Sequence, residues 1–220
     1  MPATDPDAEA KRRHAAATAP ALLAVYEAAR ADVLASVDDG QGGNLIAERW
    51  AYQLAGVIGD ALKAIAAEVG RATFADLDAA GTFDVSRMDA YLEVGAIERG
   101  RGWVNTGNES LNQIDALADE FYAEVEATMD AFVQAAEQDA ANIAESGGNF
   151  GAKEAAGAAG ALTKTWNLSS QGNHRASHIA LDGVTIGMDE RFANGLPYPQ
   201  APGPPAETVN CNCFLTFGGV

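Results

Sequence analysis

Residues 44–70 read NLIAERWAYQLAGVIGDALKAIAAEVG, and this stretch carries the clearest helical signal in the first half of the chain. Its large apolar residues recur at the 3.6-residue spacing of an amphipathic helix. They are Trp50, Leu54, Val57, Ile58, Ala61, Leu62, Ile65 and Val69. Asn44 is a suitable N-cap, and Gly70 stands where a glycine commonly ends a helix. We therefore predict a helix that ends at Gly70 and packs through one apolar face.

Further helical segments lie on both sides of this stretch. One begins near Ala8, and we expect Pro20 to interrupt it. A shorter helix over 85–99 is expected to end at the glycine-containing sequence 99–102. A second strong apolar stripe predicts an acidic helix over 108–146, broken by Gly147-Gly148-Asn149. The stripe consists of Leu111, Ile114, Leu117, Phe121, Val125, Met129, Phe132 and Ala136.

The sequence changes character after residue 161, where prolines and loop residues become frequent. Short β-prone runs occur at 184–186 and 209–217, and Asp182-Gly183 is a typical hairpin turn. The predicted fold class is α+β, mainly α. An elongated helical N-terminal region, 1–107, is followed by a domain over 108–220. That domain comprises the acidic helix and a small mixed α+β cap, 152–217, with a short sheet.

The charge is negative and unevenly distributed. The formal net charge is −17, and residues 102–152 hold ten acidic residues and no lysine or arginine. Such a surface repels phosphate backbones, which argues against direct DNA binding. There is no apolar run of membrane-spanning length and no secretory leader, so we expect no membrane partner and synthesis in a cytoplasm.

Two histidines and two cysteines near the C-terminus carry potential ligand atoms. His174 and His178 are four residues apart and would share one face of a helix. A single residue separates Cys211 from Cys213, which is closer than the spacing typical of zinc fingers. We expect no cofactor: His178 and Arg175 would make buried hydrogen bonds, and the cysteines would pack on one face of a strand. The alternative is a zinc ion held by His178, Cys211 and Cys213, with or without His174 as a fourth ligand.

The same region contains residue types that act in catalysis. A Cys–His nucleophile pair, or an acid–base pair of His178 and Asp182, is conceivable. No phosphate-binding glycine loop, nucleophile elbow or metal-hydrolase spacing accompanies these residues. We therefore predict that the chain is not an enzyme and has no catalytic residues. The alternative is a toxin-like domain with transferase or hydrolase activity that uses Arg175, His178 and Glu207.

The order of motifs in the last third is more informative than any single one. Lys-x-Trp, Arg-x-x-His, Leu-Asp-Gly, an aromatic residue, a proline-rich loop and Asn-Cys-x-Cys follow one another. This order resembles the C-terminal domain of the phage Mu protein F-like minor capsid (head morphogenesis) family, over about residues 120–215. The pattern falls on Lys164, Trp166, Arg175, His178, Asp182, Gly183, Phe192, Pro202, Asn210, Cys211 and Cys213.

The resemblance implies a structural role in a virion. A protein of this kind would be made in the host cytoplasm and incorporated in the head interior or at the portal vertex. Its partners would be the portal protein, the scaffold or the major capsid protein. Two departures argue against an intact active site. Cys-Asn-Cys stands where the family usually has Cys-Arg-Cys, and Ala-Glu-Ser at 144–146 replaces Arg-Thr-Glu.

Overall fold

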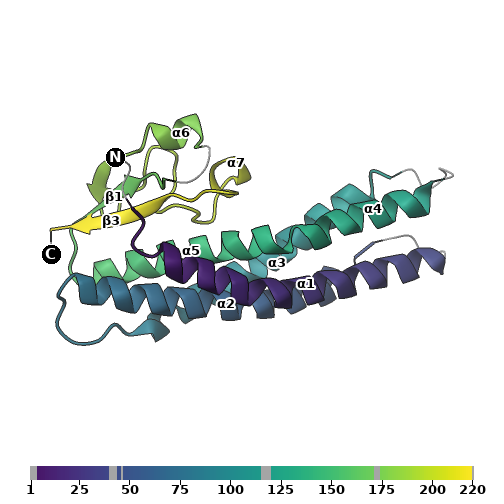
Figure 1. Cartoon of the computed structure of the whole chain (residues 1–220), viewed down its shortest axis with the longest axis horizontal. Coiled ribbons are helices and arrows are strands. Elements are labelled where there is room, and N and C mark those ends of the chain that lie inside the picture. The colour runs from purple at the N-terminus through teal and green to yellow at the C-terminus, as the bar shows by residue number, and fades with distance from the viewer. Residues whose placement is uncertain (1–3, 40–43, 46, 115–119, 171–173, 220) are drawn as a thin grey trace. The chain divides into compact units, whose positions relative to one another are not determined.

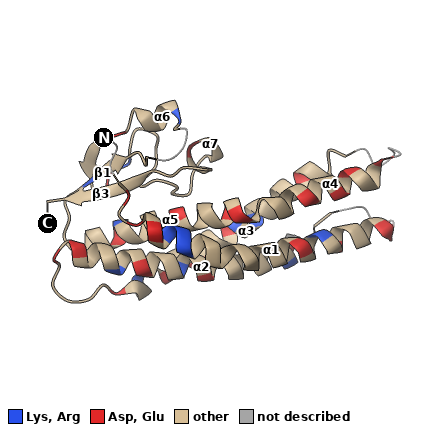
Figure 2. Ribbon diagram, in the orientation of Figure 1, with Lys and Arg blue, Asp and Glu red and all other residues tan. Residues whose placement is uncertain are grey.

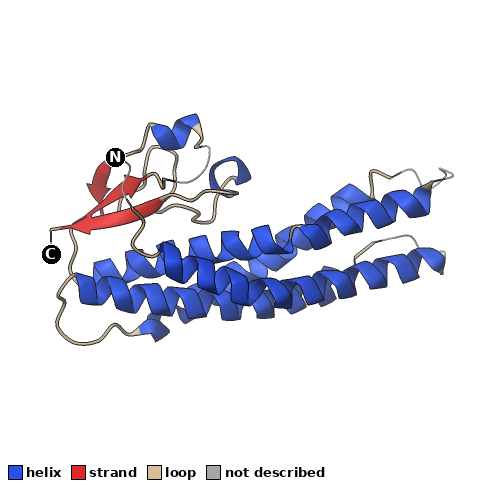
Figure 3. Ribbon diagram, in the orientation of Figure 1, coloured by secondary structure: helices blue, strands red, loops and turns tan. Residues whose placement is uncertain are grey.

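The computed structural model describes residues 4–39, 44–45, 47–114, 120–170 and 174–219. These residues form long helices followed by a small sheet with short helices (Figure 3). The predicted class, α+β and mainly α, is confirmed. In chain order (Figure 1) the elements are α1 (Ala8–Asp38), α2 (Ala47–Asp76), the 3-10 helix η1 (Val85–Met88), α3 (Asp89–Leu111), α4 (Phe121–Gln134), α5 (Ala136–Ala158), β1 (Thr163–Asn167), α6 (Ala176–Ile179), β2 (Thr185–Gly187), α7 (Pro205–Thr208) and β3 (Phe214–Gly218).

The chain divides into two compact units, and both are discontinuous in sequence. Unit 1 comprises Met1–Ala15, Ala61–Ala90 and Ala141–Val220, and unit 2 comprises Ala16–Asp60 and Tyr91–Ala140. The predicted boundary at residue 107 falls inside α3 and does not separate the units. The reason is that long helices pack along their whole length, so a unit collects segments that lie far apart in the sequence.

Unit 2 has a core of apolar and aromatic side chains from α1 to α4. Trp50, Val104 and Met129 are almost completely buried in it. The Tyr26 ring stacks on Trp103 with centroids 4.7 Å apart, and Phe132 meets the edge of Trp103. The described members of the predicted apolar stripe belong to this core or pack against it, except Ala136, which is also buried. Leu117 lies outside the described residues.

Unit 1 contains the sheet, with strand order β2-β1-β3 and both pairings antiparallel. The central strand, β1, was not predicted. Beyond the sheet, the second half of α2 packs closely on α5, where Ile65, Val69 and Ala152 form a small apolar cluster. Gly151 of α5 lies so close to α2 that an added Cβ would stand 2.3 Å from the Ala66 carbonyl oxygen.

Several glycines that we expected to end helices lie inside them instead. Gly70 is within α2, where an added Cβ would stand 2.6 Å from the Phe83 ring. Gly100 is within α3 and Gly147 within α5, where an added Cβ would stand 2.4 Å from the Ala51 carbonyl oxygen and 2.5 Å from Ile65, respectively. Gly100 and Gly147 permit close approach between helices, and Gly70 leaves room for the Phe83 ring. In each case the packing outweighs a helix-propensity cost of about 1 kcal/mol.

Other predicted boundaries were also wrong. Pro20 lies inside α1, on an exposed side where water can reach the Ala16 carbonyl that its ring leaves without a donor. The acidic helix predicted over 108–146 is not continuous, because α3 ends at Leu111 and α4 and α5 follow as separate helices. Asp182-Gly183 does form a turn, with Gly183 at φ 75°, but it joins α6 to β2 rather than two strands.

None of the helices in the described part of the chain is long and apolar enough to cross a membrane.

Candidate functional site

His178, Cys211 and Cys213 meet in the interior of unit 1. His178 lies on the short helix α6, and the cysteines lie in the irregular segment before β3, not in the strand that we had predicted. The imidazole Nδ1 is 3.5 Å from both the Cys211 and the Cys213 Sγ atoms. All three residues are at most 2% exposed, and both cysteines are free thiols. The structure therefore brings together three of the four predicted ligands.

His174 is not part of this cluster. Its Nε2 atom lies 3.0 Å from the Ser169 carbonyl oxygen. Among the described residues, the group that can share one metal ion consists of His178, Cys211 and Cys213 alone. The four-ligand set that included His174 is thus wrong in its fourth member, because His174 precedes α6 and does not share its face with His178.

Buried side chains from β1 form one side of the cluster. The Trp166 ring meets the edge of His178 at a centroid distance of 5.2 Å and contacts Phe192 at 5.0 Å. The Lys164 ammonium group donates to the carbonyls of Met188 and Glu190, each at 2.7 Å. Burial lowers the pKa of Lys164 to about 8, and the nearby Lys153 acts in the same direction. Lys164 thus ties β1 to the loop after β2, and Trp166 shields the imidazole.

Glu207 lies on the opposite edge of the imidazole from the cysteines. Its Oε2 atom is 3.2 Å from His178 Nε2, which is an ion-pair distance. The contact is poorly aligned, so the buried Nε2 atom has no hydrogen-bond partner. Ser177 and Asn194 donate hydrogen bonds to the Glu207 carboxylate, and these bonds hold the carboxylate beside the imidazole ring. From the sequence, Glu207 was expected at a site only in the enzymatic alternative.

A row of polar residues on α5 anchors the cysteine segment. Asn142, Ser146 and Asn149 are spaced four and three residues apart, so they lie on one helix face. Asn142 bonds to Asn210, Ser146 donates to the Gln200 carbonyl at 3.0 Å, and Asn149 donates to the Cys213 carbonyl at 3.0 Å. Gln200 in turn donates to the Cys211 carbonyl. This row was not predicted, although three polar residues at helical spacing within an alanine-rich helix are a recognisable signal in the sequence.

A second buried polar group joins the same network. The Lys11 ammonium is 2.9 Å from both Asp5 and Glu145 and lies 3.4 Å from the Asn149 amide oxygen. Although burial alone would lower the pKa of Lys11, Glu145 and Asp5 together raise it. The pKa of Glu145 is also raised, because its burial outweighs the attraction of Lys11. The raised pKa of Lys11 favours its charged form, whereas the raised pKa of Glu145 favours its neutral form. One ammonium serves two carboxylates, and the ion pair is the arrangement that both distances support.

The two thiols and the imidazole share protons. A hydrogen bond from Cys213, and behind it the His178 ring, holds the pKa of the Cys211 thiol below its ordinary value. The same bond to Cys211 raises the pKa of Cys213, and a bond to Cys211 raises that of His178. One sulfur of the pair therefore loses its proton much more readily than the other. Since both sulfurs are buried, the arrangement suits hydrogen bonding or metal ligation better than attack on a substrate.

The remaining motif residues shape the turns around the cluster. Arg175 donates to the Val209 carbonyl, and Asp182 accepts from the Leu168 amide at 3.0 Å. Gly183 donates to the Trp166 carbonyl at 2.8 Å. Asn210 adopts a positive φ of 56°, which an asparagine tolerates better than most residues. These residues bond to backbone groups or to Asn142, so they fix the conformation of the turns around the cluster.

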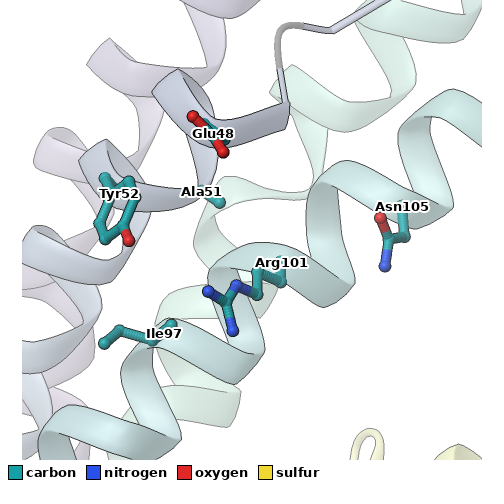
Figure 4. Close-up of a pocket in the computed structure, with 6 residues that line it drawn as sticks. All are labelled: Glu48, Ala51, Tyr52, Ile97, Arg101 and Asn105. Carbon is teal, nitrogen blue, oxygen red and sulfur yellow. The ribbon is translucent and has the colours of Figure 1, made fainter.

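Unit 2 carries a surface depression of about 260 Å³. Glu48, Ala51 and Tyr52 of α2 line it on one side, and Ile97, Arg101 and Asn105 of α3 line it on the other (Figure 4). Apart from Ala51 and Ile97 these residues are exposed. The depression brings together no histidine, cysteine or paired carboxylates, so the buried cluster of unit 1 is the stronger candidate site.

A scan against models of protein families found no match, and searches among curated proteins and solved structures found none either.

Proposed function

We propose that this chain is a structural protein of a phage head, of the Mu protein F-like minor capsid type. One observation carries the proposal: the residues on which the resemblance rests form a single assembly in the fold. Lys164, Trp166, His178, Phe192 and both cysteines are buried together. A motif scattered over fifty residues is expected to converge in space when it specifies a shared scaffold.

The acidic character of the chain supports a role beside DNA rather than on it. Acidic residues outnumber basic ones along the helices (Figure 2). Part of this charge is neutralised within the fold, because Arg30 pairs with Glu126 and Asp130, and Lys11 pairs with Glu145. Exposed carboxylates remain at Glu109, Glu120, Glu124 and Glu137. These are the places at which a basic surface of a portal, scaffold or major capsid protein would dock.

An enzymatic or toxin-like role is the second candidate, and the geometry favours it less. Glu207 and His178 do lie together, as an acid–base pair requires. His178 is only 1% exposed, however, and Arg175 is engaged with the Val209 carbonyl. A substrate would have to displace Trp166 or the cysteine segment to reach the imidazole.

The proposal is tested by the genomic neighbourhood and by co-purification. We expect the gene to lie beside a portal gene, and the untagged chain to co-sediment with portal oligomers when the two are expressed together. Mass spectrometry of purified heads should detect the chain at few copies. A gene beside an immunity gene, with no portal gene nearby and no co-sedimentation, would replace the structural role with the toxin-like one.

A further inference from the structure

The strongest unexplained feature is the arrangement of two sulfurs around a single imidazole nitrogen. His178 Nδ1 stands 3.5 Å from each of Cys211 Sγ and Cys213 Sγ. This nitrogen carries either one proton or one lone pair in the ring plane, so it can make one good hydrogen bond and not two. Hydrogen bonding to this nitrogen therefore accounts for one of the two contacts.

The distances fit the edges of a zinc tetrahedron. Zinc bonds to imidazole nitrogen at about 2.0–2.1 Å and to cysteine sulfur at about 2.3 Å, so tetrahedral geometry separates the two ligand atoms by about 3.6 Å. Both nitrogen–sulfur distances are within about 0.1 Å of that value. The ligand atoms of all three residues also lie within 4.8 Å of one another.

The chemistry of the surroundings agrees with the distances. Two thiolates neutralise a divalent cation, which makes burial of the site tolerable. A metal on Nδ1 requires the ring proton to be on Nε2, and the Glu207 carboxylate lies 3.2 Å from that atom. Metal-binding histidines commonly direct their second nitrogen at such a carboxylate. A small rotation of the Glu207 side chain would give the buried Nε2–H the acceptor that it lacks.

We infer that His178 Nδ1 and the thiolates of Cys211 and Cys213 bind one zinc ion, with Glu207 orienting the imidazole. The two thiol protons are released to solvent on binding. No fourth histidine, cysteine or carboxylate of the described residues completes the group, so the described part of the chain supplies three ligands. The ion would fasten α6 to the segment before β3. This inference does not depend on a role in a phage head.

The test uses the full-length chain, purified without chelator and freed of any histidine tag, with the bound metals counted by elemental analysis. We expect about one zinc per chain in the wild type and less than about a tenth of that in His178→Ala and Cys213→Ala. His174→Ala is the matched control, since its ring bonds to the Ser169 carbonyl, and it should keep the full complement. Glu207→Gln should keep the ion but bind it about 10- to 100-fold more weakly in competition with a chromophoric chelator.

Cobalt spectroscopy on the wild type covers the case in which the buried variants fail to fold. Cobalt(II) titrated into the metal-free chain should give the strong visible bands and the near-ultraviolet thiolate charge-transfer band of a tetrahedral site. Absence of zinc from the purified chain together with absence of these bands would overturn the inference. Zinc retained in Cys213→Ala, or lost in His174→Ala, would overturn the ligand assignment, and copper in place of zinc would overturn the choice of ion.

Discussion

Lys11 shows how much a single buried charge contributes to this fold. It lies in the first turn of α1, is only 3% exposed, and contacts Asp5, Glu145 and Asn149. Through Asn149 this charged group is continuous with the backbone of Cys213. Removal of the ammonium would leave two buried carboxylates without a counter-ion, which costs far more than the loss of a surface pair.

We predict that Lys11→Met destabilises the chain by about 3–5 kcal/mol. Arg12→Met is the matched control on the same helix, because Arg12 pairs with Glu9 where both side chains are mostly exposed. That variant should change the free energy of unfolding by less than about 0.5 kcal/mol. Urea denaturation with an unchanged m-value is the measurement. Equal effects of the two substitutions would show that the buried pair does not stabilise the fold.

A pH effect is expected at Asp7, whose pKa is raised to about 6, mainly by burial, against the opposing attraction of Lys11. Because the pKa of Asp7 in the folded chain lies above the unfolded value of 3.8, the Asp7 carboxyl is protonated in the folded state and ionised in the unfolded state between pH 3.8 and about 6. Protonation of Asp7 therefore stabilises the fold. This contribution to the free energy of unfolding is complete below about pH 4 and is lost as the pH rises through 6, by at most about 3 kcal/mol.

Asp7→Asn removes this dependence and keeps the shape of the side chain. The variant should be more stable than the wild type at pH 7.5 by about 1–3 kcal/mol, and the difference should close by pH 4. Urea midpoints of both chains across this range provide the comparison. If the difference in urea midpoint between Asp7→Asn and the wild type did not vary with pH, protonation of Asp7 would not be the cause of the change in stability.

At the scale of the elements, close contact between helices decides where glycine is required. Gly100 and Gly102 are two residues apart on α3, yet only Gly100 faces another helix. An added Cβ at Gly100 would stand 2.4 Å from the Ala51 carbonyl oxygen, whereas one at Gly102 would have nothing within 4 Å. The pair separates the packing role of glycine from its helix propensity.

We therefore predict opposite signs for the two alanine substitutions. Gly100→Ala should destabilise the chain by at least about 2 kcal/mol, because backbone atoms of α2 would have to move. Gly102→Ala should stabilise it by about 0.5–1 kcal/mol, because alanine favours a helix. Thermal and urea unfolding of both variants would test this. A stabilising Gly100→Ala would contradict the close approach of α2 and α3.

At the scale of the whole molecule, each compact unit depends on segments far apart in the sequence. Unit 1 joins the C-terminal 80 residues to Met1–Ala15 and Ala61–Ala90. The C-terminal part thus lacks Lys11, Ile65 and Val69 when it is separated from the first half. This dependence bears on the domain that we expected over residues 108–220.

We predict that a fragment of residues 108–220 does not fold on its own. It should show no cooperative unfolding transition and poor dispersion in its proton NMR spectrum, while the full chain shows both a transition and good dispersion. The reason is that its helix α5 would expose the face that packs on α2. A cooperative unfolding transition in the isolated fragment would show that residues 108–220 form an independent domain, as the sequence had predicted.

The sequence by itself determined what depends on short-range periodicity. The stripe from Trp50 to Val69 predicted an apolar helix face, and the change of composition after residue 161 predicted the small α+β part. The fold class followed from these two features. The pairing of His178 with both cysteines was also within reach, because those residue types are uncommon in this chain.

The ends of the helices, and the segments that pack into one unit, depend on contacts that form only in the folded chain. Gly70, Gly100 and Gly147 read as helix ends because local propensity disfavours glycine inside a helix. Close packing outweighs that cost, by a second helix at Gly100 and Gly147 and by the Phe83 ring at Gly70. The exclusion of His174, the positions of Glu207 and Asn149, and the burial of Lys11 all depend on contacts between residues distant in sequence. Such contacts depend on which apolar helix faces pack against each other along their length. A local pattern of residues does not specify the partner of each face.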